Sequence, residues 1–183
     1  MSQIWITSDW HFSHQQNFIY EPRGFDNVYD MNKEIIKKYN EVVQPDDDVY
    51  MLGDAMLNDN AEGIKCIKSL KGKIHIIRGN HDTETRLEEY KNCYNVIEIS
   101  EGKFLRYKKY HFYLSHYPAL TSNLDLDKPL HARIISLCGH SHVKDPFTDF
   151  DKGLIFHCEV DSNNCYPWNI EDIIKKIKER LSI

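Results

Sequence analysis

The chain has 183 residues, of which 41% are hydrophobic, 12% aromatic and 28% charged, which is typical of a globular protein and excludes a disordered, collagen-like or coiled-coil chain. The formal net charge of -5 argues against a protein devoted to binding phosphate backbones, which normally carries a basic surplus. A small phosphorylated substrate or a nucleic-acid end stays compatible with this charge. Ten histidines are many for a chain with eight glycines and six prolines.

The cysteine pattern and the N-terminal sequence predict a cytoplasmic protein. The five cysteines are odd in number and lack C-x-x-C spacing, so neither a disulfide framework nor a zinc knuckle is expected. The N-terminus reaches polar residues too early for a signal peptide, and no apolar run is long enough to span a bilayer. Because repeats and linkers are absent, we expect one domain over residues 1–183. We also expect no membrane contact and no obligate protein partner.

In chain order, short apolar runs that end in polar residues alternate with helical patterns. The runs are rich in Ile, Val, Leu or aromatic residues and end at turn formers, which predicts strands. The expected elements are a strand over 3–7, a helix over 31–43 capped by Asp30, a strand over 48–52, a helix over 59–70, a strand over 73–78, a hairpin over 103–115, strands over 134–138 and 153–160, and a last helix capped by Asn169. This order predicts a mixed α/β sheet system.

Side chains capable of metal or proton chemistry follow five of these strands. They are Asp9, His11, Asp54, Asn80, His81, His116, His140 and His142. Each motif alone is a weak signal, since a lone Asp-x-His or Gly-Asp pair is usually a turn or a helix cap. Functional groups of α/β sheets collect beyond the carboxyl ends of the strands, so eight such residues indicate one shared site. Carboxylate, imidazole and amide ligands without thiolate suit Mn, Fe, Co, Ni or Zn.

The motifs D-x-H, G-D, G-N-H-D, H and G-H-x-H follow one another at residues 9–11, 53–54, 79–82, 116 and 139–142. This ordered set resembles the calcineurin-like metallophosphoesterase superfamily. The segments SDWHFSH and DDDVYMLGD also resemble a branch of small bacterial and phage phosphoesterases. The resemblance implies an α/β fold in which two mixed β-sheets pack as a sandwich flanked by helices. Periodicity alone also allows a single doubly wound sheet.

Carried over by motif position, the resemblance implies two divalent metal ions. The implied ligands are Asp9, His11 and His142 for the first ion, Asn80, His116 and His140 for the second, and Asp54 as the bridge between them. His81 would be the catalytic histidine that binds no metal. Two ions about 3.5–4 Å apart lower the pKa of a shared water, so a metal-bridging hydroxide would attack phosphorus while His81, as general acid, protonates the leaving oxygen.

Several residues near these motifs stay open to two interpretations. His14 and Arg23 are candidates for binding a substrate phosphate, although a hydrogen bond within the loop or a solvated arginine would explain them as well. Asp82 is interpreted as a turn residue that accepts backbone N–H groups. Tyr117, directly after His116, predicts a more apolar pocket beside that ligand. The remaining histidines are interpreted as structural or surface residues: His75, His111, His131 and His157.

The function that these features favour is a dimetal phosphodiesterase acting on small diesters, nucleotides or accessible nucleic-acid ends. The motif spacing leaves no room for a cap domain, so selectivity falls to loops over residues 12–30, 55–60, 117–132 and 143–152. A phosphomonoesterase acting on a nucleotide or small phosphorylated metabolite is the alternative. A non-catalytic metal-binding scaffold of the same fold is a further alternative, against which the intact Asp54, Asn80 and His81 argue.

Overall fold

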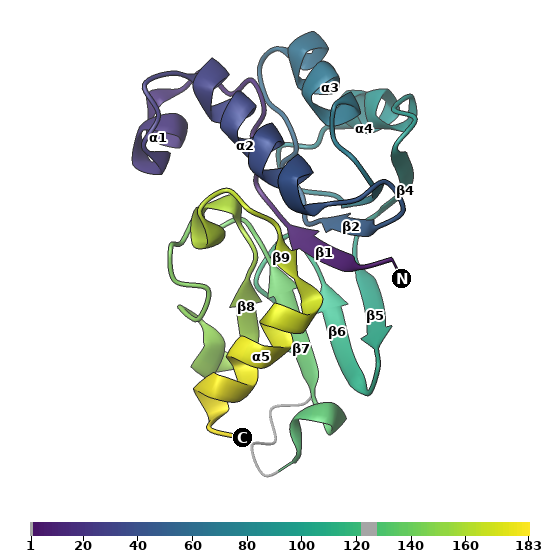
Figure 1. The fold of residues 1–183 in the computed structure, drawn as a ribbon, viewed down its shortest axis with the longest axis vertical. Helices are drawn as coiled ribbons and strands as arrows, with labels where there is room; N and C mark the ends of the chain where they lie inside the picture. The colour runs from purple at the N-terminus through teal and green to yellow at the C-terminus, as the bar shows by residue number, and fades with distance from the viewer. Residues whose placement is uncertain (1, 122–127) are drawn as a thin grey trace.

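The structure is a computed structural model that describes residues 2–121 and 128–183. Within them the strands form two sheets (Figure 1). The five-stranded sheet has the order β4 (Val96–Ser100), β3 (Lys73–Ile77), β2 (Asp48–Met51), β1 (Ile4–Thr7) and β9 (Trp168–Asn169). The four-stranded sheet has the order β5 (Lys103–Tyr107), β6 (Tyr110–Leu114), β7 (Ile134–Cys138) and β8 (Ile155–His157).

Both sheets are mixed, as the family resemblance implied. In the first sheet only the short β9 runs antiparallel to its neighbour β1. In the second sheet only the β5–β6 hairpin is antiparallel. The parallel pairs therefore point their carboxyl ends in the same direction within each sheet, and loops that follow them meet at one edge.

Helices cover one face of the five-stranded sheet, and the last helix lies in front of strands β7 and β8 (Figure 1). In the described residues they are α1 (Asn17–Tyr20), α2 (Val28–Val42), α3 (Asn60–Lys68), α4 (Glu84–Lys91) and α5 (Ile170–Leu181). Four 3-10 turns accompany them: Glu21–Arg23, Leu130–Ala132, Phe150–Lys152 and Val160–Asn163. None of the described helices is both long and apolar enough to cross a membrane.

Alternating side chains divide the first sheet between two apolar cores. Trp5 and Val49 point to the core under α2, α3 and α4, whereas their neighbours Ile6 and Tyr50 point to the core shared with the second sheet. This alternation is the period of two that a strand imposes, here with both faces covered. The second core also receives the apolar stripe of α5, which includes Ile173. The sheet that carries the first motifs is therefore held rigidly on both faces.

Most predicted elements are confirmed, with differences at their ends. The Asn169 side chain caps α5, as predicted, by accepting the N–H of Glu171. The predicted cap of α2 is wrong: Asn27 caps it by accepting the N–H of Asp30, so Asp30 lies in the first turn. The predicted strand over 153–160 shortens to β8, since a 3-10 turn follows it. Part of the expected loop over 117–132, residues 122–127, lies outside the described residues.

Candidate metal centre

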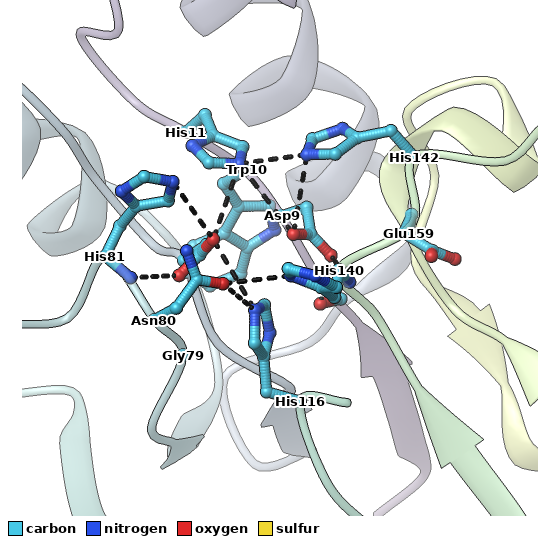
Figure 2. A network of polar contacts seen from close by, with 12 residues as sticks. Asp9, Trp10, His11, Gly79, Asn80, His81, His116, His140, His142 and Glu159 are labelled. Atoms are coloured by element: carbon cyan, nitrogen blue, oxygen red, sulfur yellow. Dashed lines mark hydrogen bonds and ion pairs between the residues drawn. The ribbon is translucent and has the colours of Figure 1, made fainter. Parts of the chain in front are cut away.

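The loops after β1, β2, β3, β6 and β7 meet at one edge of the two sheets. Backbone hydrogen bonds join them: the N–H groups of Asp9 and His11 donate to the carbonyls of Gly53 and Asp54, at 3.0 Å each. The N–H of Gly139 donates to the carbonyl of His116 at 2.9 Å, which joins the two loops of the second sheet. The eight residues predicted from the motifs are thereby brought together, and Figure 2 labels all of them except Asp54, which lies within 3.7 Å of His11 and 3.5 Å of His116.

Five of these residues have left-handed backbone conformations. Their φ angles are +57° for Asp9, +50° for His11, +59° for Asp54, +74° for His140 and +50° for His142. Non-glycine residues with positive φ are uncommon, and such strain gathers at functional sites because the surrounding structure has to maintain it. Each strand thus turns sharply at its end, which directs successive polar side chains toward a common centre.

The glycines of the motifs leave no space for a side chain. A Cβ at Gly79 would collide with Oδ1 of Asp54, and one at Gly139 would collide with Oγ of Ser8 and Oδ2 of Asp9. These three neighbours are buried groups with fixed hydrogen bonds rather than flexible chain ends. The G-N-H-D and G-H-x-H motifs therefore need glycine for the close approach of backbone to the two carboxylates.

Asp9, His11 and His142 form what we call the first half-site. The Nε2 atoms of the two histidines lie 3.1 Å apart, and each lies 3.7 Å from Oδ1 of Asp9. The other oxygen of Asp9, Oδ2, accepts the Ser8 hydroxyl at 2.5 Å and the N–H of His140 at 2.9 Å. One carboxylate oxygen is therefore held by the protein while the other faces two imidazole nitrogens.

Asn80, His116 and His140 form the second half-site. Oδ1 of Asn80 lies 2.8 Å from Nε2 of His116 and 2.9 Å from Nδ1 of His140. The Nδ1 of His116 donates to the carbonyl of Leu52 at 2.7 Å, which leaves Nε2 with its lone pair toward Asn80. Three potential ligand atoms from three separate loops thus converge, as the family resemblance implied.

Asp54 stands between the half-sites. Its Oδ2 lies 3.7 Å from Nε2 of His11 and 3.5 Å from Nε2 of His116, and the latter belongs to the second half-site. Its Oδ1 accepts the N–H of His81 at 2.8 Å. As in Asp9, one oxygen is anchored and the other is turned toward the centre, which is the placement that a bridging ligand needs.

The buried polar atoms of this centre fit a cation. Oδ1 of Asp9 is fully buried and has no hydrogen-bond partner among the residues that the structure describes. Burial raises the pKa of Asp9 to about 7 and also raises the pKa of Asp54, because a buried carboxylate without a cation is costly. Burial, followed by the charge of Arg23, lowers the pKa of His11, so that its imidazole is neutral as a ligand must be. The site is thus built for positive charge that its own side chains do not supply.

Two sets of three carboxylate and histidine residues could each hold a metal ion, because within each set one ligand atom from every residue lies within 4.8 Å of the others. The groups are Asp9, His11 and His142, and Asp9, Asp54 and His116. The chemistry of these donors, oxygen and imidazole nitrogen without thiolate, matches divalent transition metals.

His81 lies beside the half-sites with its side chain 42% exposed. Its Nε2 is 3.9 Å from Oδ2 of Asp54, and its ring centroid is 5.6 Å from that of His11. Its carbonyl accepts Nη1 of Arg86 at 2.5 Å. The imidazole is therefore held at the centre by backbone contacts while its outer face stays open to solvent.

Asp82 holds the turn that carries Asn80 and His81, as predicted. Its carboxylate accepts the N–H groups of Gly79 at 2.8 Å and Asp54 at 2.9 Å, and the hydroxyl of Tyr90 at 2.8 Å. Both of its oxygens are used in this way and its exposure is 1%. Its role is structural.

The candidates for substrate contact differ in position. The His14 ring lies 5.3 Å from that of His11 and 6.4 Å from that of His81, so it borders the centre. Arg23 does not present its guanidinium to a substrate. Its Nε, Nη1 and Nη2 all have protein partners, and its side chain is 2% exposed because Asp161 holds it. The expected phosphate contact of Arg23 is therefore replaced by a buried ion pair.

The sequence interpretation missed the acidic residues behind the centre. Asp161 lies 3.1 Å from Nδ1 of His142, and Oε1 of the buried Glu159 accepts the N–H of Ser141 at 3.1 Å. Both follow β8, as the other site residues follow their strands. That position was the available signal, but an isolated acidic residue after a short strand has no distinctive spacing.

An α/β fold of two mixed sheets, with these candidate ligands at the carboxyl ends of its strands, is the arrangement that the resemblance to metallophosphoesterases implied. The family model of the calcineurin-like phosphoesterase superfamily domain matches residues 2–157. The chain belongs to that superfamily. The narrower resemblance to small bacterial and phage phosphoesterases stays a prediction.

Similar proteins span nearly the whole chain. An uncharacterized protein of Methanocaldococcus jannaschii, MJ1445, is 32% identical over 185 residues, which are 98% of this chain and 93% of that protein. The structure of a protein of unknown function from Aquifex aeolicus, AQ665, is 24% identical, covers 96% of this chain and 100% of that chain, and superposes with a TM-score of 0.68. A structure described as a novel archaeal phosphodiesterase is 20% identical over 86% of this chain and 82% of that chain, with a TM-score of 0.48.

Proposed function

We propose that the protein is a dimetal-dependent phosphoester hydrolase, and specifically a phosphodiesterase. The observation that carries the proposal is the position of Asp54, whose Oδ2 lies within 3.7 Å of His11 and 3.5 Å of His116, one from each half-site. A carboxylate oxygen between two ligand sets suits a bridge between two ions, an arrangement that recurs in phosphatases and nucleases. A single zinc site would need neither the bridge nor the second ligand set.

In this proposal the two half-sites and Asp54 hold two divalent ions. Bound ions would supply Lewis-acid stabilisation of the phosphoryl oxygens and activation of water. In both Asp9 and Asp54, one carboxylate oxygen is anchored by a hydrogen bond, which holds the other oxygen in place. The ligand geometry is thereby fixed before substrate arrives. The donor set suits Mn, Fe, Co, Ni or Zn, and Mn²⁺ is the first ion to test.

His81 is proposed as the general acid. It is half-exposed, its Nε2 faces the bridging oxygen of Asp54 at 3.9 Å, and its backbone is fixed by the hydrogen bond to Oδ1 of Asp54. A proton held at Nε2 would lie beside a phosphoester bound over the centre, where the leaving oxygen needs it. Such proton transfer contributes about 10²–10⁴-fold to a rate.

Two exposed aromatic side chains favour a diester over a monoester. Tyr117, 53% exposed, contacts His116 and His140 with ring centroids 5.1 and 4.7 Å away. Phe18, 64% exposed, contacts the ring of His14, which borders His11. Figure 2 shows His11 and His116 on different sides of the centre. Tyr117 contacts His116 directly, and Phe18 is connected to the His11 side through the ring of His14. A diester carries an organic group on each side of phosphorus, and a nucleotide or nucleic-acid end provides flat groups for such rings.

The test is a hydrolysis panel with Mn²⁺, Zn²⁺, Ni²⁺ and Co²⁺ added singly to metal-free protein. The substrates are an aryl phosphodiester, the matching monoester, cyclic nucleotides and short oligonucleotides. Diester turnover well above monoester turnover supports the proposal, and the reverse order identifies a monoesterase. A protein that binds two ions but cleaves no phosphoester would be a scaffold of this fold.

A cytoplasmic location and a single domain over residues 1–183 also stay predictions.

A further inference from the structure

A buried ion pair lies behind the first half-site and takes no part in the proposed reaction. Arg23 donates from Nε to Oδ1 of Asp161 at 3.0 Å and from Nη2 to Oδ2 at 2.8 Å. The two side chains are 2% and 7% exposed. They come from the separate 3-10 turns Glu21–Arg23 and Val160–Asn163. Since a buried ion pair is weak evidence for stability in itself, its position calls for another explanation.

The pair reaches the first half-site from two directions. On one side, Oδ2 of Asp161 lies 3.1 Å from Nδ1 of His142. On the other side, Arg23 donates to the carbonyl of Asp9 at 2.9 Å and to that of Trp10 at 3.2 Å. These carbonyls belong to the D-x-H loop, whose Asp9 has positive φ. The guanidinium of Arg23 therefore links the strained D-x-H loop, which carries Asp9 and His11, to the carboxylate of Asp161 behind His142.

The hydrogen-bond arrangement also determines which nitrogen of His142 is protonated. Nη2 of Arg23 lies 3.2 Å from Nδ1 of His142 and can only donate, whereas the carboxylate of Asp161 can only accept. Nη2 has two hydrogens, and the carboxylate of Asp161 and the carbonyl of Asp9 already accept them at shorter distances. Nδ1 of His142 is therefore the donor to Asp161, and Nε2 keeps its lone pair toward the centre.

We infer that Asp161 and Arg23 are positioning residues for the first metal ion. Asp161 selects the tautomer and the orientation of His142, and Arg23 orients Asp161 and the D-x-H loop. The second half-site has other supports: Nδ1 of His116 donates to the neutral carbonyl of Leu52, and the N–H of His140 donates to Oδ2 of Asp9. The two ions should therefore depend differently on this pair. This inference rests on the proposed dimetal site, but it concerns metal binding rather than turnover.

The test is calorimetric titration of metal-free protein with Mn²⁺ alone. We expect wild-type protein to bind two ions. Asp161→Asn should weaken one of the two sites by about 10–100-fold, the usual effect of losing an outer-shell partner, and leave the other within about twofold. Arg23→Lys keeps the charge but lacks the planar fork, so it should weaken the same site less, and it serves if Asp161→Asn does not fold. Asp48→Asn is the matched control, because Asp48 accepts from His75 at 2.9 Å far from the metal ligands.

The outcomes separate this inference from the proposed function. Two sites of wild-type affinity in a folded Asp161→Asn or Arg23→Lys variant would overturn the inference and leave the function intact. Equal weakening of both sites with a lower melting temperature would also overturn it, because that pattern indicates general destabilisation. Failure of wild-type protein to bind Mn²⁺ would overturn both. In Zn²⁺-loaded protein, a ¹H–¹⁵N correlation should show the proton of His142 on Nδ1, and a proton on Nε2 would contradict the inference.

Discussion

The two half-sites contain similar candidate ligands but are held in different ways. In the first half-site, Asp9 is fully buried and His142 is held by the ion pair of Arg23 and Asp161. In the second half-site, Asn80 and His140 are exposed, and only His116 is buried. The first half-site is thus organised by a buried ion pair, whereas in the second His116 is held by the neutral carbonyl of Leu52 and His140 by the hydrogen bond from its N–H to Asp9.

This difference suggests a division of work between the two proposed ions. A site whose ligands are fixed before binding loses little freedom when an ion arrives, and preorganised sites bind more tightly for that reason. A site with exposed ligands leaves room for a phosphoryl oxygen and for solvent exchange. We therefore expect the first ion to be retained on dialysis and the second to depend on added metal.

Replacing Asp54, the proposed bridging ligand, should impair both half-sites and abolish hydrolysis. Asp54→Asn keeps the size of the side chain but removes the charge that both ions would share. We expect diester hydrolysis to fall by more than about 10⁴-fold, since both the metal activation and the general-acid step depend on this centre. The measurement is kcat/KM for an aryl phosphodiester at saturating Mn²⁺. Activity within tenfold of wild type would show that Asp54 does not bridge.

His81 should affect chemistry without affecting either half-site. His81→Ala should lower kcat for a diester with a poor leaving group by about 10²–10⁴-fold and have much less effect on one with a good leaving group, which needs no proton. Mn²⁺ stoichiometry should stay as in wild type, because neither half-site includes His81. A variant that binds the ions normally and cleaves poor leaving groups at the wild-type rate would exclude the general-acid role.

Tyr117 tests whether the open half-site selects substrates. Tyr117→Ala should raise KM for aryl and nucleotide diesters by roughly 2–10-fold, the value of one aromatic contact, with little change in kcat. Tyr117→Phe keeps the ring and should behave as wild type. Dialkyl diesters are the control substrate, because they offer no flat group to the ring. Equal effects of Tyr117→Ala on aryl and alkyl diesters would argue against a specificity role.

The parts of the site that were predictable from the sequence are those determined within a few residues of a strand end. Asp54 and His81 each follow an apolar run and a glycine, so the local pattern alone places them at the edge of a sheet. The contact between Arg23 and Asp161 joins residues 138 positions apart through two short 3-10 turns. No periodicity marks such turns. The sequence therefore left Arg23 open to a phosphate contact or a solvated position in the loop, whereas its charge is used inside the protein.

The fold shows the same limit. Helix α4 was not predicted because its eight residues bury only Leu87 and Tyr90, too few to form a recognisable apolar stripe. β9 has two residues and pairs with β1 across the length of the chain. In contrast, α5 has a continuous stripe and a capping asparagine, and it was predicted. Elements with their own pattern are predictable, and elements that exist only through tertiary contacts are not.

The smallest effect concerns a buried histidine that resembles His142 but lies apart from the metal ligands. His157 is fully buried, with Nδ1 3.0 Å from Oε1 of Glu159, Nε2 3.0 Å from Oδ2 of Asp149 and Nδ1 3.6 Å from the Sγ of Cys138. Burial opposes its protonation, but the hydrogen bonds and charges of Glu159 and Asp149 outweigh burial and raise the pKa of His157 above its ordinary value.

A histidine whose pKa is higher in the folded than in the unfolded state stabilises the protein fully below its unfolded pKa of about 6.5, and this stabilisation is lost as the pH rises through the folded pKa. The free energy of unfolding of metal-free protein should therefore fall above pH 6.5 partly through His157, with a slope of less than one proton. His157→Gln should be less stable at pH 6 and should show a shallower fall, measured by urea denaturation from pH 6 to pH 8.5. The exposed His111, replaced by Gln, is the control. An unchanged slope in His157→Gln would mean that the pKa of His157 is the same in the folded and the unfolded state, so that Glu159 and Asp149 would not favour its charged form.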